Sequence, residues 1–319
     1  MQSAEISIIF PVKNLENEIS EILSFAAQQV KGIDTEFIVV DMGSSDRTVF
    51  QAVRLMKDRE LHGFVIQNGD STVSTALNTG IQKAGGNYLT FIFARRLYES
   101  FLATYLETAK RAKADFVFGC IDKDEVRSAE RRSVSSAIRQ PGGNEFLKAI
   151  LKHTTGVDIS AILVRRHFLQ EKELSFQEAS SYGYSEEFVG RCLLGASVVV
   201  QAPVALRRCQ DFELKRGKQK PAGTGIFQRV EATLHILDAA KLNYANDTEL
   251  IRLLERYRLP LAVMSAVDVL LREGNRFQDV RMYLQASGYD HLLGIDRAMD
   301  GNLKRKILLW RTAPWLYKP

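Results

Sequence analysis

Short apolar runs rich in β-branched residues alternate with amphipathic segments from Ile6 to Cys120, and this alternation constrains the fold most strongly. Each run is apolar throughout, and the segment after it carries apolar residues at helical spacing. Strands that are buried on both faces and separated by helices predict an α/β fold, with a mostly parallel sheet covered by helices on both faces. The predicted strands are Ile6–Val12, Glu36–Asp41, Phe64–Gln67, Tyr88–Phe93, Asp115–Cys120, Ile159–Val164 and Ser197–Val200.

The composition narrows the class of protein. Of the 319 residues, 45% are hydrophobic and 25% are charged, which is ordinary for a globular chain and excludes a disordered or fibrous one. The formal net charge of +5 suits an anionic ligand but is too small to indicate a nucleic-acid partner. The three cysteines lack metal-ligand spacing, and no segment has the pattern of a secretion signal or a membrane span. We therefore expect a cytoplasmic protein, free or at the inner face of the membrane.

The pattern changes near residue 210, which suggests the domain boundaries. Residues 1–210 carry the strand and helix alternation and are expected to form one α/β domain. Residues 211–225 combine basic residues with Gly and Pro, as in a basic loop or linker. Residues 226–319 show helical spacing, which predicts a helical C-terminal region. Within the first part, the polar stretch Asp122–Gln140 is expected to be an excursion from the fold.

The residues just after the strands are the first candidates for a binding site. Open parallel sheets bind ligands at the carboxyl ends of their strands, where the strand order reverses. The strand-end segments are Asn14, Asp41 to Asp46, Asn68 to Ser71, and Ala94 to Arg96. An alternative for Asp41 to Asp46 is a plain strand-to-helix turn, with Asp46 as the helix N-cap.

Four segments follow one another in a specific order. They are Ile6-Ser-Ile-Ile-Phe-Pro-Val-Lys-Asn14, Phe37-Ile-Val-Val-Asp-Met-Gly-Ser-Ser-Asp-Arg-Thr48, Ser74-Thr-Ala-Leu-Asn-Thr-Gly80 and Gly86-Asn-Tyr-Leu-Thr-Phe91. Together they resemble the family 2 glycosyltransferases of the GT-A fold, and a weaker similarity continues to about Arg208. The resemblance implies transfer of a sugar from a nucleotide donor, a UDP-sugar first of all, to a glycan or lipid-linked acceptor in cell-surface polysaccharide assembly.

The resemblance also implies which residues meet the nucleotide. Asp41 stands where the family reads the nucleoside, although the usual second Asp is replaced by Met42. The basic residue that the family aims at the diphosphate is replaced by Leu77. The implied nucleotide-binding residues are Pro11, Asn14, Asp41, Gly43, Ser44, Asp46 and Asn78.

The metal motif of the family is absent. Where the family has Asp-x-Asp after the fourth strand, this chain has Phe93-Ala-Arg-Arg96. Phe has no ligand atom and Arg repels a cation, so neither Mg²⁺ nor Mn²⁺ is expected as a cofactor and no metal ligand is assigned. Three interpretations stay open: catalysis is lost, Arg95 or Arg96 contacts the diphosphate in place of the cation, or both are solvated charges. Asp122-Lys-Asp124 has the letters of the motif but follows the fifth strand.

The motif that supplies the catalytic base is shifted. The segment Tyr182–Arg191 resembles the Tyr-Gly-Glu-Asp motif of the family, but the two acidic positions fall on Tyr184 and Ser185. Glu186 and Glu187, just after them, are the candidate bases for the acceptor proton. The alternative is that both are first-turn acids that complement the dipole of the following helix.

Two basic regions remain. Arg207–Lys220 can attract a diphosphate or form a solvated linker, and residues 302–319, which contain no acid, suit either a membrane interface or a packed last helix. A protein partner or a homodimer through the C-terminal helices is a further expectation. Two functions therefore compete: a glycosyltransferase with an unusual mechanism, and an inactive relative that binds a nucleotide or glycan or scaffolds an active partner.

Overall fold

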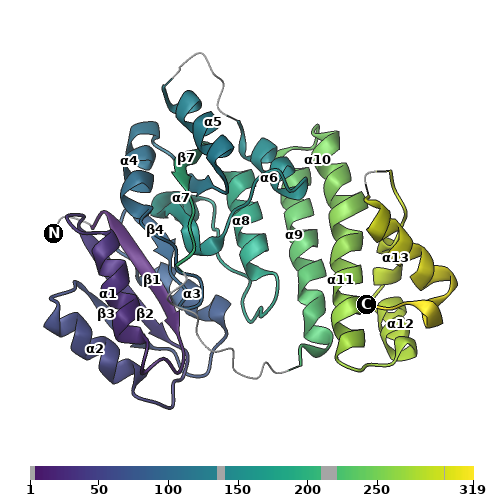
Figure 1. The fold of residues 1–319 in the computed structure, drawn as a ribbon, viewed down its shortest axis with the longest axis horizontal. Helices are drawn as coiled ribbons and strands as arrows, with labels where there is room; N and C mark the ends of the chain where they lie inside the picture. The colour runs from purple at the N-terminus through teal and green to yellow at the C-terminus, as the bar shows by residue number, and fades with distance from the viewer. Residues whose placement is uncertain (1–3, 135–140, 210–220, 298) are drawn as a thin grey trace. The chain divides into compact units, whose positions relative to one another are not determined.

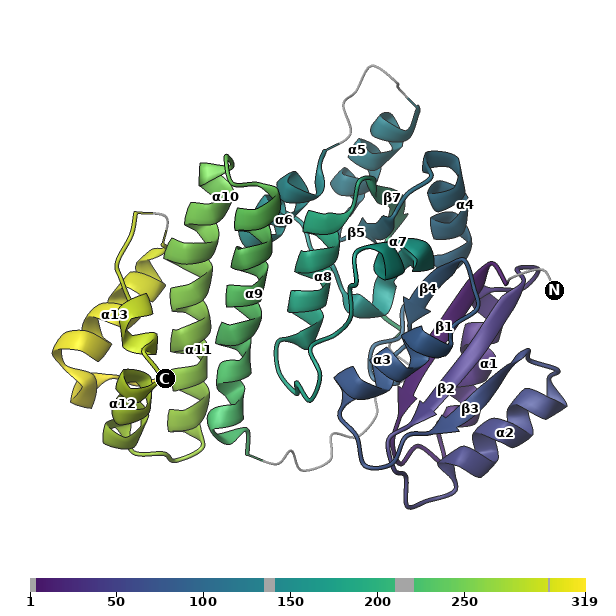
Figure 2. The ribbon, with the colours of Figure 1, turned by 180° about the vertical axis from the view of Figure 1, so that it is seen from behind.

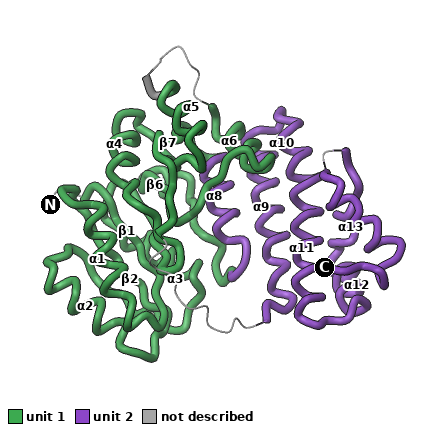
Figure 3. The backbone as a smooth tube through the Cα atoms, viewed as in Figure 1, with its two compact units in different colours: residues 1–180, 195–215 green, residues 181–194, 216–319 purple. Residues whose placement is uncertain are grey.

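Residues 4–134, 141–209, 221–297 and 299–319 are described by the computed structural model of the chain. The chain forms two compact units, which are coloured separately in Figure 3. Unit 1 comprises Met1–Ser180 and Gly195–Lys215, and unit 2 comprises Ser181–Leu194 and Arg216–Pro319. This division differs from the predicted one, because residues 181–194 group with the C-terminal helices. Most of the expected linker 211–225 lies outside the described residues.

Unit 1 is built on one sheet of seven strands in the order β3-β2-β1-β4-β6-β5-β7. β6 runs antiparallel to both of its neighbours, and the other neighbouring strands are parallel. The predicted α/β class with a mostly parallel sheet is confirmed. The strands are β1 (Ile6–Val12), β2 (Thr35–Asp41), β3 (Gly63–Gln67), β4 (Tyr88–Phe91), β5 (Phe116–Cys120), β6 (Ile162–Arg165) and β7 (Val199–Ala205).

Helices cover both faces of this sheet, as Figures 1 and 2 show from opposite sides. On one face, α1 (Ile19–Gln29), α2 (Thr48–Asp58) and α4 (Leu102–Ala112) share a buried apolar cluster with β1. α3 (Val73–Lys83) packs on the other face, where a Cβ on Gly80 would lie 2.4 Å from Cγ2 of Ile9. Only glycine allows this close approach of helix and strand. Unit 1 also contains α6 (Gly143–Leu151), η1 (Ile159–Ala161) and α7 (Arg166–Glu171).

The polar stretch after β5 contains a helix, α5 (Lys123–Val134), so the predicted excursion is wrong for these residues. Asp122 Oδ1 accepts the backbone N–H groups of Asp124 and Glu125 at 2.9 and 2.8 Å, which satisfies two donors at the helix start. Acidic residues in the first turn and basic residues in the last turn complement the helix dipole. Residues 135–140 lie outside the described residues.

The regular elements in the described part of unit 2 are helices, as the spacing predicts. α8 lies next to the others through a close contact, because a Cβ on Gly190 would lie 2.9 Å from Ile236 Cδ1. The elements are α8 (Tyr184–Gly195), η2 (Gly223–Phe227), α9 (Gln228–Asn243), α10 (Thr248–Leu253), η3 (Leu254–Arg258), α11 (Leu259–Arg272), α12 (Phe277–Ala286), η4 (Tyr289–Leu292), α13 (Gly301–Thr312) and η5 (Pro314–Leu316).

A π-helical turn, η3, separates α10 from α11. The N–H of Leu259 donates to the carbonyl of Leu254, five residues back instead of four. Pro260 has no N–H and cannot donate to the carbonyl of Arg256, so the regular helical ladder is already interrupted here. Turns of this kind are rare and are found frequently at functional sites.

The end of the chain packs on unit 2. Trp310 of α13 is buried and meets Tyr317 edge to face, with ring centroids 5.6 Å apart. The Tyr317 hydroxyl donates to buried Asp268 of α11 at 2.5 Å. The expectation of a packed last helix is therefore confirmed, while Trp315 and Leu316 beyond it are exposed.

Within the described part of the chain, none of the helices combines the length and the hydropathy needed to span a bilayer. The three cysteines lie in this part and are free thiols. Burial raises the pKa of the Cys120 thiol to about 12, so this thiol stays protonated and unreactive.

Candidate nucleotide site and catalytic motif

The carboxyl ends of β1, β2 and β3 lie side by side because the strands are parallel neighbours. Asn14, after β1, has a φ of 51°, which Asn tolerates better than most residues. Its N–H donates to the Ser44 hydroxyl at 2.9 Å, and its Oδ1 accepts the N–H of Ser45 at 2.9 Å. The structure therefore brings the predicted residues Asn14 and Ser44 together.

The Asp46 carboxylate ties the loop after β1 to the start of α2. It accepts the N–H of Glu16 at 3.1 Å, and the N–H and hydroxyl of Thr48 at 2.9 and 2.5 Å. Burial acts to raise the pKa of Asp46, but the hydrogen bonds from Thr48 and Glu16 outweigh it and the pKa is lowered from its ordinary value. The carboxylate is thus an ionised structural anchor, close to the capping role that the sequence left open.

Asp41, the last residue of β2, is buried with 4% of its surface exposed. Its carboxylate accepts the N–H groups of Gly43 and Ser44 at 3.2 Å. A carboxylate offers about four lone-pair sites, so one further donor can be accepted. That remaining capacity is what a nucleoside-reading role for Asp41 requires.

The loop after β3 completes this edge. Gly43 has a φ of +78°, and a Cβ there would lie 3.1 Å from the backbone of Gly69 and Asp70, so the two loops touch. Lys13 pairs with Asp70 across 2.6 Å and joins the loops after β1 and β3. The sequence analysis missed Lys13, whose only signal was its place after a strand. We call residues 13–16, 41–48 and 68–71 the strand-end cradle.

Two predicted nucleotide residues are held within the fold. Pro11 is buried inside β1, opposite Val40 of β2. Asn78 is buried on α3, where its amide donates to the carbonyl of Phe176 at 2.9 Å and accepts the N–H of Phe176 at 2.8 Å. The amide of Asn78 thus fixes the backbone at Phe176. The nucleotide-binding roles of Pro11 and Asn78 stay predictions.

A tight turn follows β4 at the place of the metal motif. The N–H of Arg96 donates to the carbonyl of Phe93 at 2.9 Å, and the Arg95 and Arg96 side chains are exposed. Mg²⁺ and Mn²⁺ take oxygen ligands, whereas this turn offers guanidinium groups. Among the described residues, no group of three or more His, Cys, Asp or Glu side chains is placed to hold a metal ion. The side chains of this turn, Phe93 to Arg96, therefore offer no ligand atom to a divalent cation.

A third arginine reaches this turn from the end of β7. The segment after β7 pairs with the segment after the turn, the N–H of Glu99 donating to the carbonyl of Arg207 at 2.9 Å. Arg208 Nη2 donates to the carbonyl of Arg95 at 3.2 Å. Across the described ranges, no carboxylate forms an ion pair with Arg95 or Arg208. We call Arg95, Arg96 and Arg208 the arginine turn; residues 210–220 of the predicted basic region lie outside the described residues.

Asp158, the residue just before η1, contacts the arginine turn. Its Oδ2 accepts the Tyr98 hydroxyl at 2.8 Å, its Oδ1 accepts the N–H of Ser160 at 2.9 Å, and Arg96 Nη1 lies 3.7 Å from Oδ1. Burial and then the Asp158 charge raise the pKa of Tyr98, so the phenol remains a donor. The Asp158 carboxylate thus holds Tyr98 and Arg96 next to each other at the turn.

The shifted acidic motif lies on α8 in unit 2, and its two glutamates have different surroundings. Glu187 is 2% exposed, and its Oε1 lies 2.9 Å from His235 Nδ1 and 3.3 Å from Arg191 Nη1. Glu186 is exposed and accepts the Ser185 hydroxyl at 2.9 Å. Of the two candidate bases, Glu186 is the one whose carboxylate is open to a substrate.

We compared the chain with models of protein families, and one of them matches the part that carries the cradle and the turn after β4. The model of glycosyl transferase family 2 matches residues 7–172, which contain the strand-end cradle together with Arg95 and Arg96. The chain belongs to glycosyl transferase family 2. The resemblance seen in the four sequence segments is thereby confirmed, and the absence of the metal motif stays a prediction.

Two curated relatives share part of this family 2 chain. EpsJ of Bacillus subtilis strain 168, described as an uncharacterized glycosyltransferase, is 34% identical over 191 residues, or 57% of this chain and 54% of EpsJ. Glycosyltransferase GlyA of Streptococcus pneumoniae serotype 4 is 35% identical over 91 residues, or 28% of this chain and 12% of GlyA. The family 2 chain thus spans about half of EpsJ and a small part of GlyA.

Solved structures share the fold. S. aureus TarS 1–349 aligns with a TM-score of 0.66 and 13% identity, covering 96% of this chain and 87% of that one. TarS 1–349 in complex with UDP-GlcNAc aligns over the same shares of the two chains, with a TM-score of 0.58 and 13% identity. At this identity the likeness shows the fold alone, and it confirms the GT-A-like fold for this family 2 chain.

Proposed function

We propose that this family 2 chain transfers a sugar from a UDP-sugar to a hydroxyl of a glycan or lipid-linked acceptor in cell-surface polysaccharide assembly, without a divalent metal. The arginine turn carries the proposal, because it lies at the carboxyl end of β4, beside the strand-end cradle, where family 2 implies the diphosphate. The solved complex of TarS with UDP-GlcNAc supports the choice of donor.

The arginines supply the charge that the missing cation would supply. A guanidinium group binds phosphate oxygens through two parallel N–H groups and keeps its charge at any physiological pH. Arg95 and Arg208 have no carboxylate to neutralise them within the described residues. They are therefore free to stabilise the negative charge that grows on the leaving diphosphate.

The proposed reaction needs one base. The acceptor oxygen attacks the anomeric carbon, the bond from that carbon to the diphosphate oxygen breaks, and UDP leaves with the electron pair. The acceptor proton passes to the Glu186 carboxylate, which is exposed on α8. Glu187 is excluded from this role in the proposal, since His235 and Arg191 already engage its carboxylate.

Calorimetric titration of UDP into the full chain, in EDTA and in Mn²⁺, tests this proposal. We expect binding in EDTA that Mn²⁺ does not strengthen, and a loss of about tenfold in affinity for Arg95→Ala. Binding that requires Mn²⁺ would contradict the metal-free part. An absence of binding in both conditions, repeated with GDP, would overturn the nucleotide part.

An inactive binding protein is the second candidate, and the altered motif positions favour it. The resemblance implies that Met42 and Leu77 replace residues at the nucleotide and diphosphate, that Phe93 and Arg95 replace the metal ligands, and that Tyr184 and Ser185 replace the acidic pair. The two candidates differ in one measurement, the release of UDP from UDP-sugars over a panel of acceptors. UDP binding without any release, equal in the wild type and in Glu186→Gln, would establish the binding protein.

Location and partners stay predictions. We place the protein in the cytoplasm or at the inner face of the membrane. Trp315 and Leu316 are 69% and 61% exposed next to Lys318, and they are the side chains by which such a contact would form. A protein partner or homodimer is equally a prediction for sedimentation analysis.

A further inference from the structure

A cavity of about 180 Å³ lies within unit 2, between the start of α8 and the helices α9 and α11. Its walls include Arg229, Arg258, Thr233, Ser265 and Glu186. One water molecule takes about 30 Å³ of liquid, so the cavity has room for a phosphate or carboxylate group and a few waters. It is too small for a whole sugar nucleotide.

A glycine places one arginine in this wall. Gly183 has a φ of +78°, and a Cβ there would lie 2.9 Å from Ala232 Cβ and 3.0 Å from Arg229 Cα. Only glycine lets the chain enter α8 directly against α9. The shifted acidic motif and Arg229 are thereby held at one place.

The π-helical turn places the other arginine. Arg258 is the last residue of η3, and its side chain is half-buried in the cavity wall. Ser265 of α11 lines the cavity about two helical turns further on. The two arginines therefore come from different helices and converge on one space.

Among the described residues, Arg229 and Arg258 pair with no counter-charge, in contrast to two other arginines of unit 2. Arg191 pairs with Glu187, and Arg252 pairs with Asp296. For Arg229 and Arg258, no ion pair forms with any described residue. Glu186 is the one carboxylate in the cavity wall, so two positive charges face one negative charge there. Arg258 is half-buried whereas Arg229 is exposed, so the cost of unpaired charge falls on Arg258, and an anion would relieve that cost.

We infer that this cavity binds the phosphate or carboxylate group of a hydroxyl-bearing acceptor. Arg229 and Arg258 hold the anion, and the Ser265 hydroxyl is placed to donate to it. Glu186 repels the anion and attracts a hydroxyl, so a bound molecule presents a hydroxyl group to Glu186. Naming the ligand an acceptor rests on the proposed function, whereas the binding of an anion rests on unit 2 alone.

Calorimetry with small probes tests the inference on the full chain. The probes are glycerol phosphate, lactate and glycerol, which carry a phosphate, a carboxylate and no charge. We expect glycerol phosphate or lactate to bind and glycerol not to bind. We expect Arg229→Ala, Arg258→Gln and Ser265→Ala to lower the affinity for the anion, the two arginine variants by about tenfold each. Arg258→Gln keeps a long polar side chain in the wall, so we expect this variant to retain its fold.

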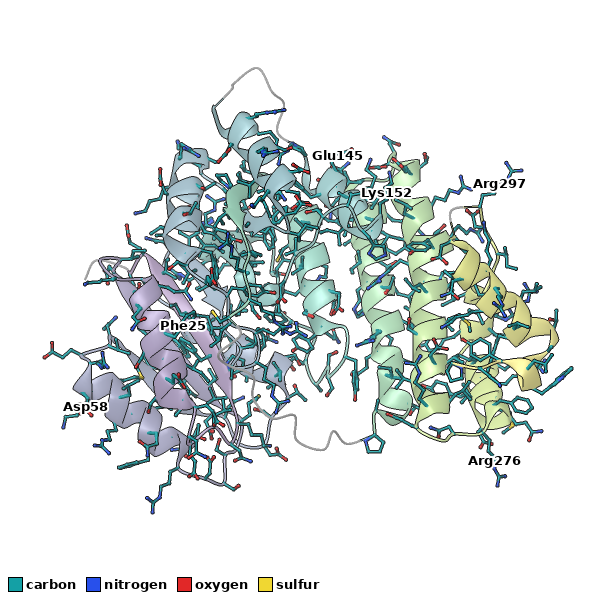
Figure 4. All side chains as sticks on the ribbon, in the orientation of Figure 1. Phe25, Asp58, Glu145, Lys152, Arg276 and Arg297 are labelled. Carbon is teal, nitrogen blue, oxygen red and sulfur yellow. The ribbon has the colours of Figure 1, made fainter. Side chains whose placement is uncertain are left out.

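Arg276→Ala is the matched control, because Arg276 is exposed before α12 and points away from the helices in Figure 4. Its affinity for the anion is expected to equal that of the wild type. Equal affinity in Arg229→Ala and Arg258→Gln would overturn the inference. Loss of anion binding in Arg208→Ala would also overturn it, because that result would mean that the probe binds at the arginine turn. UDP titrated into the same variants reports the proposed function separately, and Arg229→Ala is expected to leave UDP affinity unchanged.

Discussion

Arg208 donates a hydrogen bond from its guanidinium group to the backbone carbonyl of Arg95, a residue 113 positions earlier in the chain, across 3.2 Å. This contact holds the end of β7 against the turn after β4. It leaves most of the donors of the Arg208 guanidinium group uncommitted, since the group carries five N–H donors. The contact therefore positions the guanidinium charge of Arg208 at the turn and leaves most of its N–H donors for another acceptor.

Replacing Arg208 is expected to weaken nucleotide binding. Arg208→Ala removes a positive charge next to the proposed diphosphate position, and we expect UDP affinity in EDTA to fall about tenfold by calorimetry. Arg54→Ala is the control, because Arg54 is exposed on α2 and pairs with Asp58. Unchanged UDP affinity in Arg208→Ala would remove Arg208 from the site.

Asp46→Asn is expected to lower stability at neutral pH by about 1 kcal/mol, because a charged hydrogen-bond acceptor is lost. The folded pKa of Asp46 is lowered below its ordinary value of 3.8. Its contribution is therefore present above that value and is lost as the pH falls through the lower folded pKa. Urea unfolding of both proteins should give a constant difference near neutral pH that shrinks below about pH 4. A difference that grows in acid would contradict this assignment.

Asn78→Ala is expected to destabilise unit 1 by about 1–3 kcal/mol, because both buried hydrogen bonds between the Asn78 amide and the Phe176 backbone would be lost. Chemical unfolding measures this loss, and Gln82→Ala, at an exposed amide on the same helix, is the control. UDP affinity of the folded variant is expected to stay within a factor of about two of the wild type. A larger drop would show that the Asn78 amide meets the nucleotide.

The two glutamates of α8 are expected to separate stability from catalysis. Glu187→Gln removes a buried charge that holds Arg191 and His235, and we expect a loss of about 1–3 kcal/mol in unfolding free energy. Glu186→Gln is exposed and should leave stability unchanged while it abolishes UDP release from the donor. Comparison of melting curves and turnover for the pair is the measurement. Full turnover in Glu186→Gln would exclude Glu186 as the base.

Much of unit 1 is predictable from sequence because its strands have the apolar sequences typical of burial on both faces. Ile6–Val12 is apolar along its whole length and lies in the middle of the sheet. α5 escaped prediction because it has hardly any apolar face, Ala129 being buried among exposed neighbours. Its start was nonetheless marked by Asp122, whose capping carboxylate the sequence analysis weighed only as a metal ligand.

The site was predictable only where it depends on strand ends. Asn14 and Asp41 follow strands, so the parallel pairing of β1 and β2 brings them together. The contact between Arg95 and Arg208 depends on how distant segments pair, and no local pattern reports that. The grouping of α8 with the C-terminal helices was hidden for the same reason, since it depends on what Gly183 touches across space.

The π-helical turn at Leu254–Arg258 sets the rotation of α10 relative to α11. In an α-helix each residue advances the face by about 100°, so a single inserted residue rotates everything before it relative to everything after it. Removing one turn residue before Arg258 would leave Arg258 and Ser265 in phase, because both follow the deletion, and would rotate α10 by about 100° relative to them. The extra residue of the turn therefore sets which face α10 presents to its neighbours while Arg258 and Ser265 line the cavity.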